Sequence, residues 1–454
     1  MDLYAEVVDR ALFPLWESSV RGRPTLDILR HLEETQRRPL EELQALQLGA
    51  LRRLLRHAYA HVPFYRARLD AARLQPTDIR TLEDLRRLPI LGRDEVRGAG
   101  TSRASVTAPL PAIHKTTTGS SGSPLAISYD LGSEHWRQAT RLRGYGWAGY
   151  RVGAKTMHYW GRQLPLPGLA GAKVYVDRLL RNERYVDCSA RSDGDLELAT
   201  KELKRAAPRV LVAFAQAAAD LARFVNASRA RTWPNIAVIC AAERLLPSDR
   251  EAIAEAFGPN VFETYGSREV MLIGAECEAH DGLHLSMENL LVELVVREHG
   301  GPRPAEEGET GEVVLTDLHN YGMPLIRYAS GDLAVSRGRA PCPCGRTLAR
   351  IGPIEGRVTE TLVDGDGGKV AGLLFIVAMV GLGQSCEAFQ VVQHHDRSVT
   401  VRVSGNHLAA EAEARLRARV TPYLRGLPLR IERVDELPLD PSGKRRPVIV
   451  ERGA

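Results

Sequence analysis

Residues 1–100 place their apolar side chains at helical spacing. Between Glu41 and Tyr65 the leucines return to one side of a helix, at Leu43, Leu46, Leu48, Leu51, Leu54 and Leu55. Such spacing predicts an amphipathic helix. Pro63 is expected to end it, because proline has no backbone N–H for the helical hydrogen bonds. The whole segment is therefore predicted to be mainly helical.

Residues 110–320 alternate short apolar runs with helical patterns. The clearest example consists of the strand-like runs 209–214 and 236–240 with the helical pattern 217–225 between them. This alternation predicts an α/β domain with largely parallel strands. Two further strand-like runs, 290–296 and 311–316, are joined by a turn rich in Pro, Gly and Glu, which predicts a hairpin.

The pattern changes between Gly352 and Arg357. Beyond this point three strand-like segments surround one helical pattern, at 389–392, 398–403 and 430–434 around 409–423. A unit of ~100 residues with this content is typical of a small α+β domain. We therefore predict a large α/β domain at 1–356, with a helical start and parallel-rich sheets, and a small C-terminal domain at 357–454.

Composition and charge exclude several classes of function. The chain has 454 residues, of which 44% are apolar and 26% charged, and a formal net charge of +5. This small, dispersed excess does not suit a nucleic-acid partner, which needs basic residues on one face. The start of the chain lacks a secretory signal, and the longest apolar run, 373–382, is shorter than the ~20 residues of a membrane span. We expect a cytoplasmic protein with reduced thiols and no membrane contact.

The first candidate motif for chemistry is Thr-Thr-Thr-Gly-Ser-Ser-Gly-Ser-Pro, from Thr116 to Pro124. Its glycines let the backbone approach a ligand, and its hydroxyl and N–H groups can bind phosphate oxygens. No Lys follows the last Gly, so the motif differs from the common P-loop. A flexible Ser/Gly linker is the alternative.

The second candidate motif, Glu-Thr-Tyr-Gly-Ser-Arg-Glu from Glu263 to Glu269, directly follows the strand-like run 260–262. Strand ends are common ligand sites in α/β sheets. Tyr265 can stack on a base there, and Glu269 can hold Mg²⁺. A surface turn with a solvated Arg–Glu pair is the alternative.

Three shorter motifs follow. Asp332 comes after a Gly turn, where an acidic side chain can bind a ribose diol, although an ordinary Asp-containing turn has the same pattern. Glu355-Gly356-Arg357 lies at the predicted domain boundary, and Pro441–Arg446, with the sequence Pro-Ser-Gly-Lys-Arg-Arg, lies near the end of the chain. Taken alone, the last motif is a basic tail.

The order of these motifs decides between the alternatives. A hydroxyl/Gly loop, Tyr-Gly-x-x-Glu, Tyr-x-x-Gly-Asp, Gly-Arg and Ser-Gly-Lys follow one another along the chain. From about residue 50 onward, the chain resembles the adenylate-forming superfamily of acyl-CoA synthetases, peptide-synthetase adenylation domains and luciferases. It is most similar to phenylacetate–CoA ligases and their CapK-like relatives, through His61–Tyr65, Glu263–Glu269, Cys277, Gly282–His284 and Cys342–Arg346.

The resemblance implies an ATP- and Mg²⁺-dependent ligase that adenylates a carboxylic acid, releases pyrophosphate and passes the acyl group to coenzyme A. An aryl or arylacetic acid is the first expectation. The small domain is expected to be mobile and to rotate about a hinge near Arg357 between the two half-reactions. Lys444, reaching between the α-phosphate and the carboxylate, and Arg357 are the implied catalytic residues, and Glu269 would coordinate Mg²⁺. The implied ATP-binding residues are Thr117, Thr118, Gly119, Ser120, Ser121, Gly122, Ala242, Glu243, Tyr265, Gly266, Ser267 and Asp332.

The chain departs from the family pattern at several positions. Leu125 and Arg268 stand where the family often has Lys and Thr or Ser, and Thr359 stands where the hinge usually carries Asp or Lys. The segment 212–216 replaces the usual turn beside the acyl pocket. The departure at the hinge leaves open a CoA-independent ligase that forms an amide or ester with an amine or hydroxyl acceptor, and the segment 212–216 leaves the identity of the acid open. A non-catalytic nucleotide-binding zinc protein is a remoter alternative, and the resemblance also allows a homodimer.

Cysteine spacing raises the question of a metal. Cys342 and Cys344, with Cys277 and His284, offer three thiolates and one imidazole, which is a usual set for structural zinc. His280 competes with His284 by spacing. Ordinary thiols are the alternative, and the resemblance to cysteine-bearing members of the branch favours zinc. Four protein ligands would leave no open position for catalysis.

Overall fold

The computed structural model describes two compact units. The described residues are 3–107, 113–117, 125–161, 168–298, 301–338, 340–357, 361–367, 369–372, 375, 378–379, 388–404, 408–438, 446 and 448–451. The first unit comprises residues 1–330 and 335–353, and the second comprises 331–334 and 354–454. The sequence pattern places the division after residue 356.

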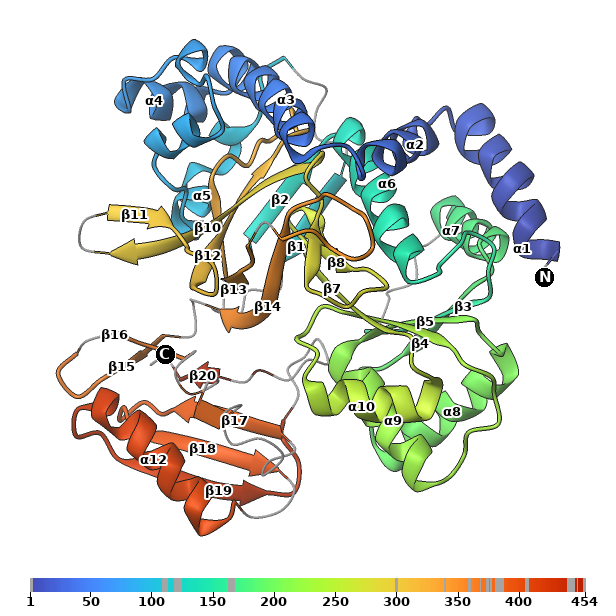
Figure 1. Cartoon of the computed structure of the whole chain (residues 1–454), viewed down its shortest axis with the longest axis vertical. Coiled ribbons are helices and arrows are strands. Elements are labelled where there is room, and N and C mark those ends of the chain that lie inside the picture. The colour runs from blue at the N-terminus through green and yellow to red at the C-terminus, as the bar shows by residue number, and fades with distance from the viewer. Residues whose placement is uncertain are drawn as a thin grey trace. The chain divides into compact units, whose positions relative to one another are not determined.

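The N-terminal segment is helical, as predicted (Figure 1, blue). Its elements are α1 (Leu3–Val7), η1 (Val8–Leu12), η2 (Leu15–Val20), α2 (Thr25–Thr35), α3 (Leu40–His61), α4 (Pro63–Ala71), η3 (Pro76–Asp78), η4 (Glu83–Arg87), α5 (Arg93–Ala99) and η5 (Gly100–Arg103). The helix expected over Glu41–Tyr65 is two helices. Pro63 ends α3 as expected and also begins α4, where its missing N–H is not needed.

One sheet of twelve strands dominates the first unit. Its order is β11-β10-β12-β13-β14-β9-β8-β7-β6-β5-β3-β4. The strands are β3 (Thr156–Trp160), β4 (Glu183–Asp187), β5 (Val210–Phe214), β6 (Ala237–Ala241), β7 (Val261–Ser267), β8 (Met271–Glu276), β9 (Leu283–Leu285), β10 (Leu290–Glu298), β11 (Gly301–Pro304), β12 (Thr310–Asp317), β13 (Tyr328–Ser336) and β14 (Arg350–Arg357). Strands β3 to β7 pair in parallel, whereas β7–β8, β8–β9 and β10–β12 pair antiparallel.

The central parallel strands β5 and β6 are buried on both faces. The helices of this region are α6 (Leu131–Trp147), α7 (Gly168–Leu180), α8 (Asp193–Ala206), α9 (Ala215–Ala227) and α10 (Pro247–Phe257). Leu211 and Val238 point into a core shared with α8, α9 and α10, whereas Val212 and Ile239 point into a core shared with α6 and the N-terminal helix. Alternate residues of a strand face opposite sides, so a strand that is buried on both faces is apolar at every position. Its sequence is then a continuous apolar run.

The predicted hairpin is confirmed, with one addition. Strands β10 and β12 pair antiparallel, and the connecting turn contains the short strand β11, which the sequence did not predict. A separate pair, β1 (Ile113–Thr117) and β2 (Leu125–Tyr129), is also antiparallel. The Thr/Gly/Ser motif connects β1 to β2 in the sequence.

The second unit is a small α+β domain, as predicted. Its four-stranded sheet has the order β19-β18-β17-β20, and β15 pairs with β16. The elements are β15 (Thr361–Val363), β16 (Lys369–Ala371), β17 (Ala388–Gln393), β18 (Val399–Ser404), α12 (Ala410–Leu424), β19 (Leu429–Val434) and β20 (Val448–Val450). Leu416, Val420 and Leu424 recur at four-residue intervals and pack α12 onto this sheet.

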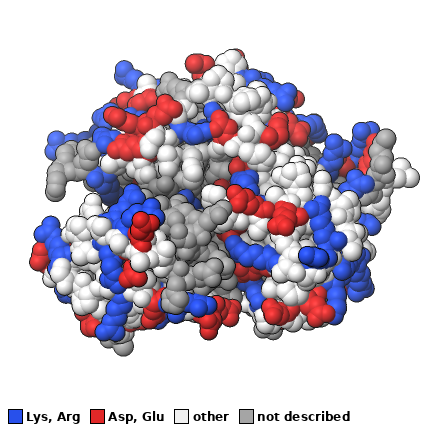
Figure 2. Space-filling view, turned by 60° about the horizontal axis from the view of Figure 1, so that its bottom comes forward, with Lys and Arg blue, Asp and Glu red and all other residues white. Residues whose placement is uncertain are grey.

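Surface charge is mixed in sign. On the face in Figure 2, Lys and Arg are interspersed with Asp and Glu and do not form a basic stripe. Within the described part of the chain, no helix has both the length and the apolarity that a bilayer crossing requires.

Candidate functional site

The carboxyl ends of the parallel strands meet at one edge of the sheet. Trp160 ends β3 and Phe214 ends the neighbouring β5, with ring centroids 4.4 Å apart. Glu243 follows β6, and its Oε2 accepts a hydrogen bond of 3.0 Å from the backbone N–H of Gln216. Ala242, beside it, adopts a left-handed backbone with φ of +66°. Ligands of α/β proteins bind outside this edge. The aromatic pair was not singled out from the sequence, although the position of both rings at strand ends was a usable signal.

The motif from Glu263 to Glu269 lies differently from the expectation. Strand β7 continues to Ser267, so Glu263 and Tyr265 lie within the strand and not in a turn after it. The register shifts between Tyr265 and Gly266, which is a β-bulge. A Cβ at Gly266 would collide with the carbonyl oxygen of Met271, so only glycine fits there.

Tyr265 and Glu269 are both 7% exposed. Glu269 lies in the turn between β7 and β8, and its Oε1 accepts a hydrogen bond of 3.5 Å from the hydroxyl of Tyr328. Tyr328 was not predicted as a site residue, although it is the Tyr of the Tyr-x-x-Gly-Asp motif. A carboxylate held in this way presents its other oxygen for a hard cation such as Mg²⁺.

The carboxyl group of Glu263, within β7, is buried and has a raised pKa. Burial raises the pKa of Glu263 to about 7, against a backbone hydrogen bond from Leu245 that lowers it, and the nearby Glu276 raises it further. Glu276 in turn accepts from the N–H of Glu263 at 2.6 Å and pairs with Arg250 at 2.8 Å. The arrangement fixes the start of β7 against β8.

The other predicted nucleotide and catalytic residues are placed only in part. Asp332 lies inside β13, directly after Gly331, whose φ is +79°, and it is 7% exposed. Arg357 ends β14 and Thr117 ends β1, but their side chains are outside the description. The remaining predicted residues lie outside the described part of the chain; they are Thr118, Gly119, Ser120, Ser121, Gly122 and Lys444. Their roles stay predictions.

The four predicted zinc ligands converge. Cys277 follows β8, His284 lies in β9, and Cys342 and Cys344 lie between β13 and β14. Their ligating atoms are all within 4.8 Å of one another. The Sγ atoms of Cys277 and Cys342 are 3.6 Å apart, and Nε2 of His284 is 3.3 Å from Sγ of Cys344.

The second ring nitrogen distinguishes His284 from His280. Nδ1 of His284 is 3.1 Å from the carbonyl oxygen of Leu348 and must donate to it, which leaves the Nε2 lone pair directed at the thiols. Burial lowers the pKa of His284 to about 4, so the imidazole is neutral, as a metal ligand must be. His280 instead lies 3.4 Å from the carboxylate of Glu276. The donor set therefore fits a closed tetrahedral zinc site.

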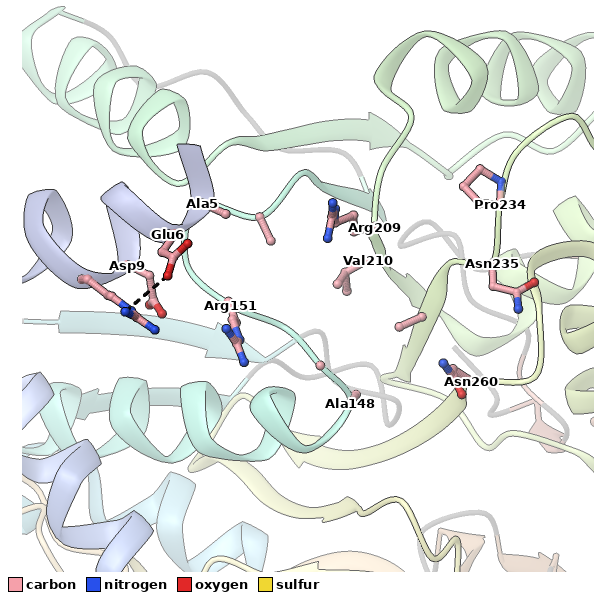
Figure 3. Close-up of a pocket in the computed structure, with 14 residues that line it drawn as sticks. Ala5, Glu6, Asp9, Ala148, Arg151, Arg209, Val210, Pro234, Asn235 and Asn260 are labelled. Atoms are coloured by element: carbon pink, nitrogen blue, oxygen red, sulfur yellow. Dashed lines mark ion pairs between the residues drawn. The ribbon is translucent and has the colours of Figure 1, made fainter. Parts of the chain in front are cut away.

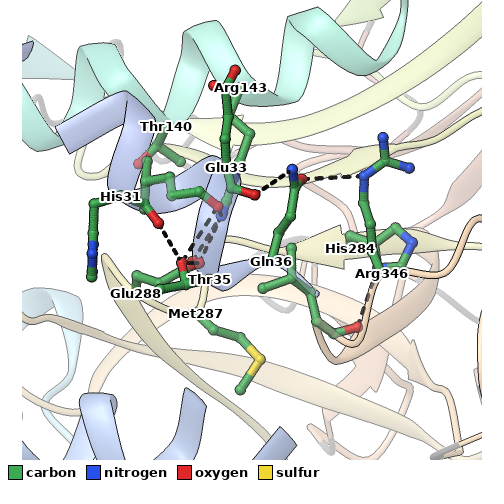
Figure 4. A network of polar contacts seen from close by, with 12 residues as sticks. His31, Glu33, Thr35, Gln36, Thr140, Arg143, His284, Met287, Glu288 and Arg346 are labelled. Carbon is green, nitrogen blue, oxygen red and sulfur yellow. Dashed lines mark hydrogen bonds and ion pairs between the residues drawn. The ribbon is translucent and has the colours of Figure 1, made fainter. Parts of the chain in front are cut away.

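A polar network connects the helices α2 and α6 to the cysteine loop, which is the loop between β13 and β14 that carries Cys342 and Cys344 (Figure 4). The guanidinium of Arg346 pairs with Glu278 at 2.8 Å and donates to the side-chain oxygen of Gln36 at 3.2 Å. In α6, Arg143 forms an ion pair of 2.7 Å with Glu288, and each side chain is 2% exposed. Such buried pairs and hydrogen bonds hold α2, α6 and the cysteine loop in one arrangement.

A cavity of about 650 Å³ lies away from these residues (Figure 3). It is lined by Val210 and Ala237 at the amino ends of β5 and β6, and by Arg151, Arg209 and Asn260. Helix α6 ends at Trp147, next to the cavity, and the carbonyl end of a helix attracts cations such as Arg151. None of the predicted site residues lines it.

Comparison with known proteins places the chain in a family. No protein-family model matches it. It is 31% identical over 337 residues to the phenylacetate–coenzyme A ligase of Thermus thermophilus, covering 72% of each chain. Against the enzyme of the same name from Escherichia coli it is 28% identical over 335 residues, covering 71% of this chain and 73% of the relative. A crystal structure of 2-hydroxyisobutyryl-CoA ligase, in the postadenylation state with R3-HIB-AMP, matches with a TM-score of 0.70 at 20% identity over 92% of both chains, a likeness of fold. The chain belongs to the phenylacetate–coenzyme A ligase family.

Proposed function

We propose that the protein activates a carboxylic acid with ATP, releases pyrophosphate, and transfers the acyl group from the acyl adenylate to coenzyme A in the cytoplasm. The observation that carries the proposal is the 31% identity to a phenylacetate–coenzyme A ligase over 72% of both chains. The reaction class, AMP-forming acid–thiol ligation, follows from that family membership. The ordered motifs assign individual residues to the steps.

The nucleotide is proposed to bind along the carboxyl edge of the sheet. Tyr265, held in place by the bulge at Gly266, would stack on adenine, with Ala242, Glu243 and Ser267 around it. Asp332 would bind the ribose hydroxyls. Glu269 would hold Mg²⁺ with the oxygen that Tyr328 leaves available, and the ion would offset phosphate charge.

The chemistry of the first half-reaction needs charge neutralisation more than proton transfer. An ionised carboxylate attacks the α-phosphorus and pyrophosphate leaves, so both reactants are anionic and no general base is required. The segment Thr117–Gly122 would bind the β- and γ-phosphates, and Lys444 and Arg357 would supply positive charge. In the second half-reaction the thiol of coenzyme A attacks the activated carbonyl and AMP leaves.

The proposed acid is an aryl or arylacetic acid. Trp160 and Phe214 lie 4.4 Å apart at neighbouring strand ends, with Phe214 buried in the core and Trp160 partly exposed at the edge where the nucleotide would lie. A flat aromatic group packs well against such rings. The partly exposed ring of Trp160 and the identity to a phenylacetate–coenzyme A ligase together support an aromatic acid over a short aliphatic one.

The cysteine cluster is proposed to hold one structural Zn²⁺. The support is the convergence of Cys277, His284, Cys342 and Cys344, together with the orienting hydrogen bond of His284 to Leu348. The ion would join the strand β9 to the loop that precedes β14. No step of the reaction is assigned to it.

The proposal is tested by ATP- and Mg²⁺-dependent pyrophosphate release against aryl, arylacetic and aliphatic acids, each with and without coenzyme A. We expect release with an aromatic acid and faster AMP formation when coenzyme A is present. If an amine or alcohol accelerates AMP formation and coenzyme A never does, the product is an amide or ester and not a thioester. If protein that binds ATP releases no pyrophosphate with any of the acids, the proposed activity is wrong.

A further inference from the structure

Strand β1 carries one cation beside the Thr/Gly/Ser motif. Lys115 directly precedes Thr116, where the motif begins. Within the two described strands β1 and β2 it is the one Lys or Arg side chain. Leu125, which follows the motif at the start of β2, is apolar and 2% exposed. Of these two strands, only β1 can therefore offer the positive charge of a lysine to a ligand.

The side chain of Lys115 is supported by a buried aromatic ring. Its Nζ lies 5.0 Å from the ring centroid of Tyr129, a fully buried residue of β2. Tyr129 pairs with Ile113, two residues before Lys115, so Lys115 and Tyr129 are diagonal neighbours across the hairpin, a distance that long side chains can reach. The guanidinium of Arg137 in α6 lies 3.9 Å from the same ring and pairs with Asp317 at 2.6 Å. The ring is therefore held in place and orients the ammonium group of Lys115.

The charge of Lys115 lacks a close counter-charge. The side chain is half-buried, yet it forms no ion pair with any residue that the structure describes. Burial lowers the pKa of Lys115, and Glu134 opposes this effect without pairing with the ammonium group. The nearby cations Arg137 and Arg268 lower the pKa as well. A half-buried ammonium group next to other cations is stabilised by an anion, so these charges favour an anionic ligand.

We propose that Lys115 binds the β- and γ-phosphates of ATP, an inference that rests on the proposed function and adds a residue to it. Arg268, whose charge acts on Lys115, directly precedes Glu269, the proposed ligand of Mg²⁺. Lys115 therefore lies on the side of the sheet where the phosphates would meet the ion. When the carboxylate displaces pyrophosphate, the electrons of the broken P–O bond go to the pyrophosphate, and a cation at this end stabilises that charge. Lys444 would act at the other end, on the α-phosphate.

The test is the affinity of the full chain for ATP and for AMP, measured by titration calorimetry with Mg²⁺ and without any acid, so that no adenylate forms. Lys115→Met removes the charge but keeps a long apolar stem against Tyr129, so the fold should be retained. We expect the dissociation constant of ATP to rise about 10- to 100-fold, as for the loss of one hydrogen bond between charged groups. The dissociation constant of AMP, which lacks these two phosphates, should be unchanged. Lys115→Arg keeps the charge and should bind ATP more tightly than Lys115→Met.

The matched control is Lys155→Met, because Lys155 is exposed and directly precedes β3, at the amino edge of the sheet. This variant should bind both nucleotides as the natural protein does. The inference is wrong if Lys115→Met binds ATP as tightly as the natural protein. It is also wrong if the affinities for ATP and AMP fall equally, because the side chain then acts through the fold and not on the two phosphates. A natural protein that binds neither nucleotide would overturn the proposed function, and this inference with it.

Discussion

The cysteine cluster and the carboxyl edge of the sheet, where the nucleotide is proposed to bind, bring distant residues together in different ways. In the cluster, the ligating atoms of Cys277, His284, Cys342 and Cys344 all lie within 4.8 Å of one another. At the edge, Glu243 and Glu269 contact their own supports, the N–H of Gln216 and the hydroxyl of Tyr328. The cluster is complete within the protein chain, whereas the edge would be one side of the proposed site, with the substrate as its other side.

This difference separates stability from rate. A zinc ion enclosed by four protein ligands would stabilise the fold and have no position open to substrate. A Mg²⁺ ion on Glu269, with Lys444 near the α-phosphate, would stabilise charge that develops during the reaction. Substitutions in the two regions are therefore expected to affect different measurements.

The largest effect is expected for Lys444→Ala. Removal of the charge beside the α-phosphate should lower the rate of adenylation by about 1,000-fold or more, because a preorganised charge at the reacting atoms is hard to replace. Thioester formation from a supplied acyl adenylate should continue, and the melting temperature should not change. Pyrophosphate release and adenylate consumption, measured separately, check this. Arg445→Ala is the neighbouring control, and adenylation at the natural rate in Lys444→Ala would exclude the assigned role.

The strands and the small domain were easier to predict from the sequence than the positions of individual residues in the two regions. Periodicity located β5 and β6 within one residue because these strands are apolar on both faces. It also predicted the small α+β unit. It placed Glu263 and Tyr265 after the strand, because the bulge at Gly266 that lets β7 continue has no signal in apolar spacing. It left His280 and His284 as alternatives, since the choice depends on the strand pairing that sets His284 beside Cys344.

A smaller but still kinetic effect is expected for Glu269→Gln. The amide keeps the shape of the side chain but loses the charge that a hard cation needs. We expect adenylation to slow by about 100-fold, with partial recovery at high Mg²⁺ concentration. Glu251→Gln, at an exposed position of α10, is the control. A Mg²⁺ dependence identical to that of the natural protein would remove Glu269 from the metal site.

For the cluster, Cys342→Ser should change stability and not chemistry. We expect the zinc content, measured by mass spectrometry of the metal, to fall from one ion per chain towards none. The free energy of unfolding should fall by about 2–4 kcal/mol, which is comparable to the loss of a disulfide bond. The turnover number at low temperature should be unchanged. Cys188→Ser, at a buried cysteine outside the cluster, should keep its zinc. A natural protein that purifies without zinc and binds none would leave the cluster as ordinary thiols.

The smallest effect is expected for Glu263→Gln. The backbone N–H of Glu263 donates to the carboxylate of Glu276, the residue before Cys277. Glu263 therefore lies between the two regions. Burial raises its pKa to about 7 from an ordinary value near 4.5. Between these values the folded protein keeps a proton that the unfolded chain has lost, so this group makes stability fall as pH rises, and the loss is complete above the folded pKa. Glu263→Gln removes the titration. Its free energy of unfolding, relative to the natural protein, should therefore increase across this window by on the order of 1–3 kcal/mol. Urea unfolding at several pH values measures the difference, with Glu251→Gln as the control. Because every other titrating group is common to both proteins, a difference that stays constant with pH would show that Glu263 is already ionised in the fold and that its burial is compensated by Arg250.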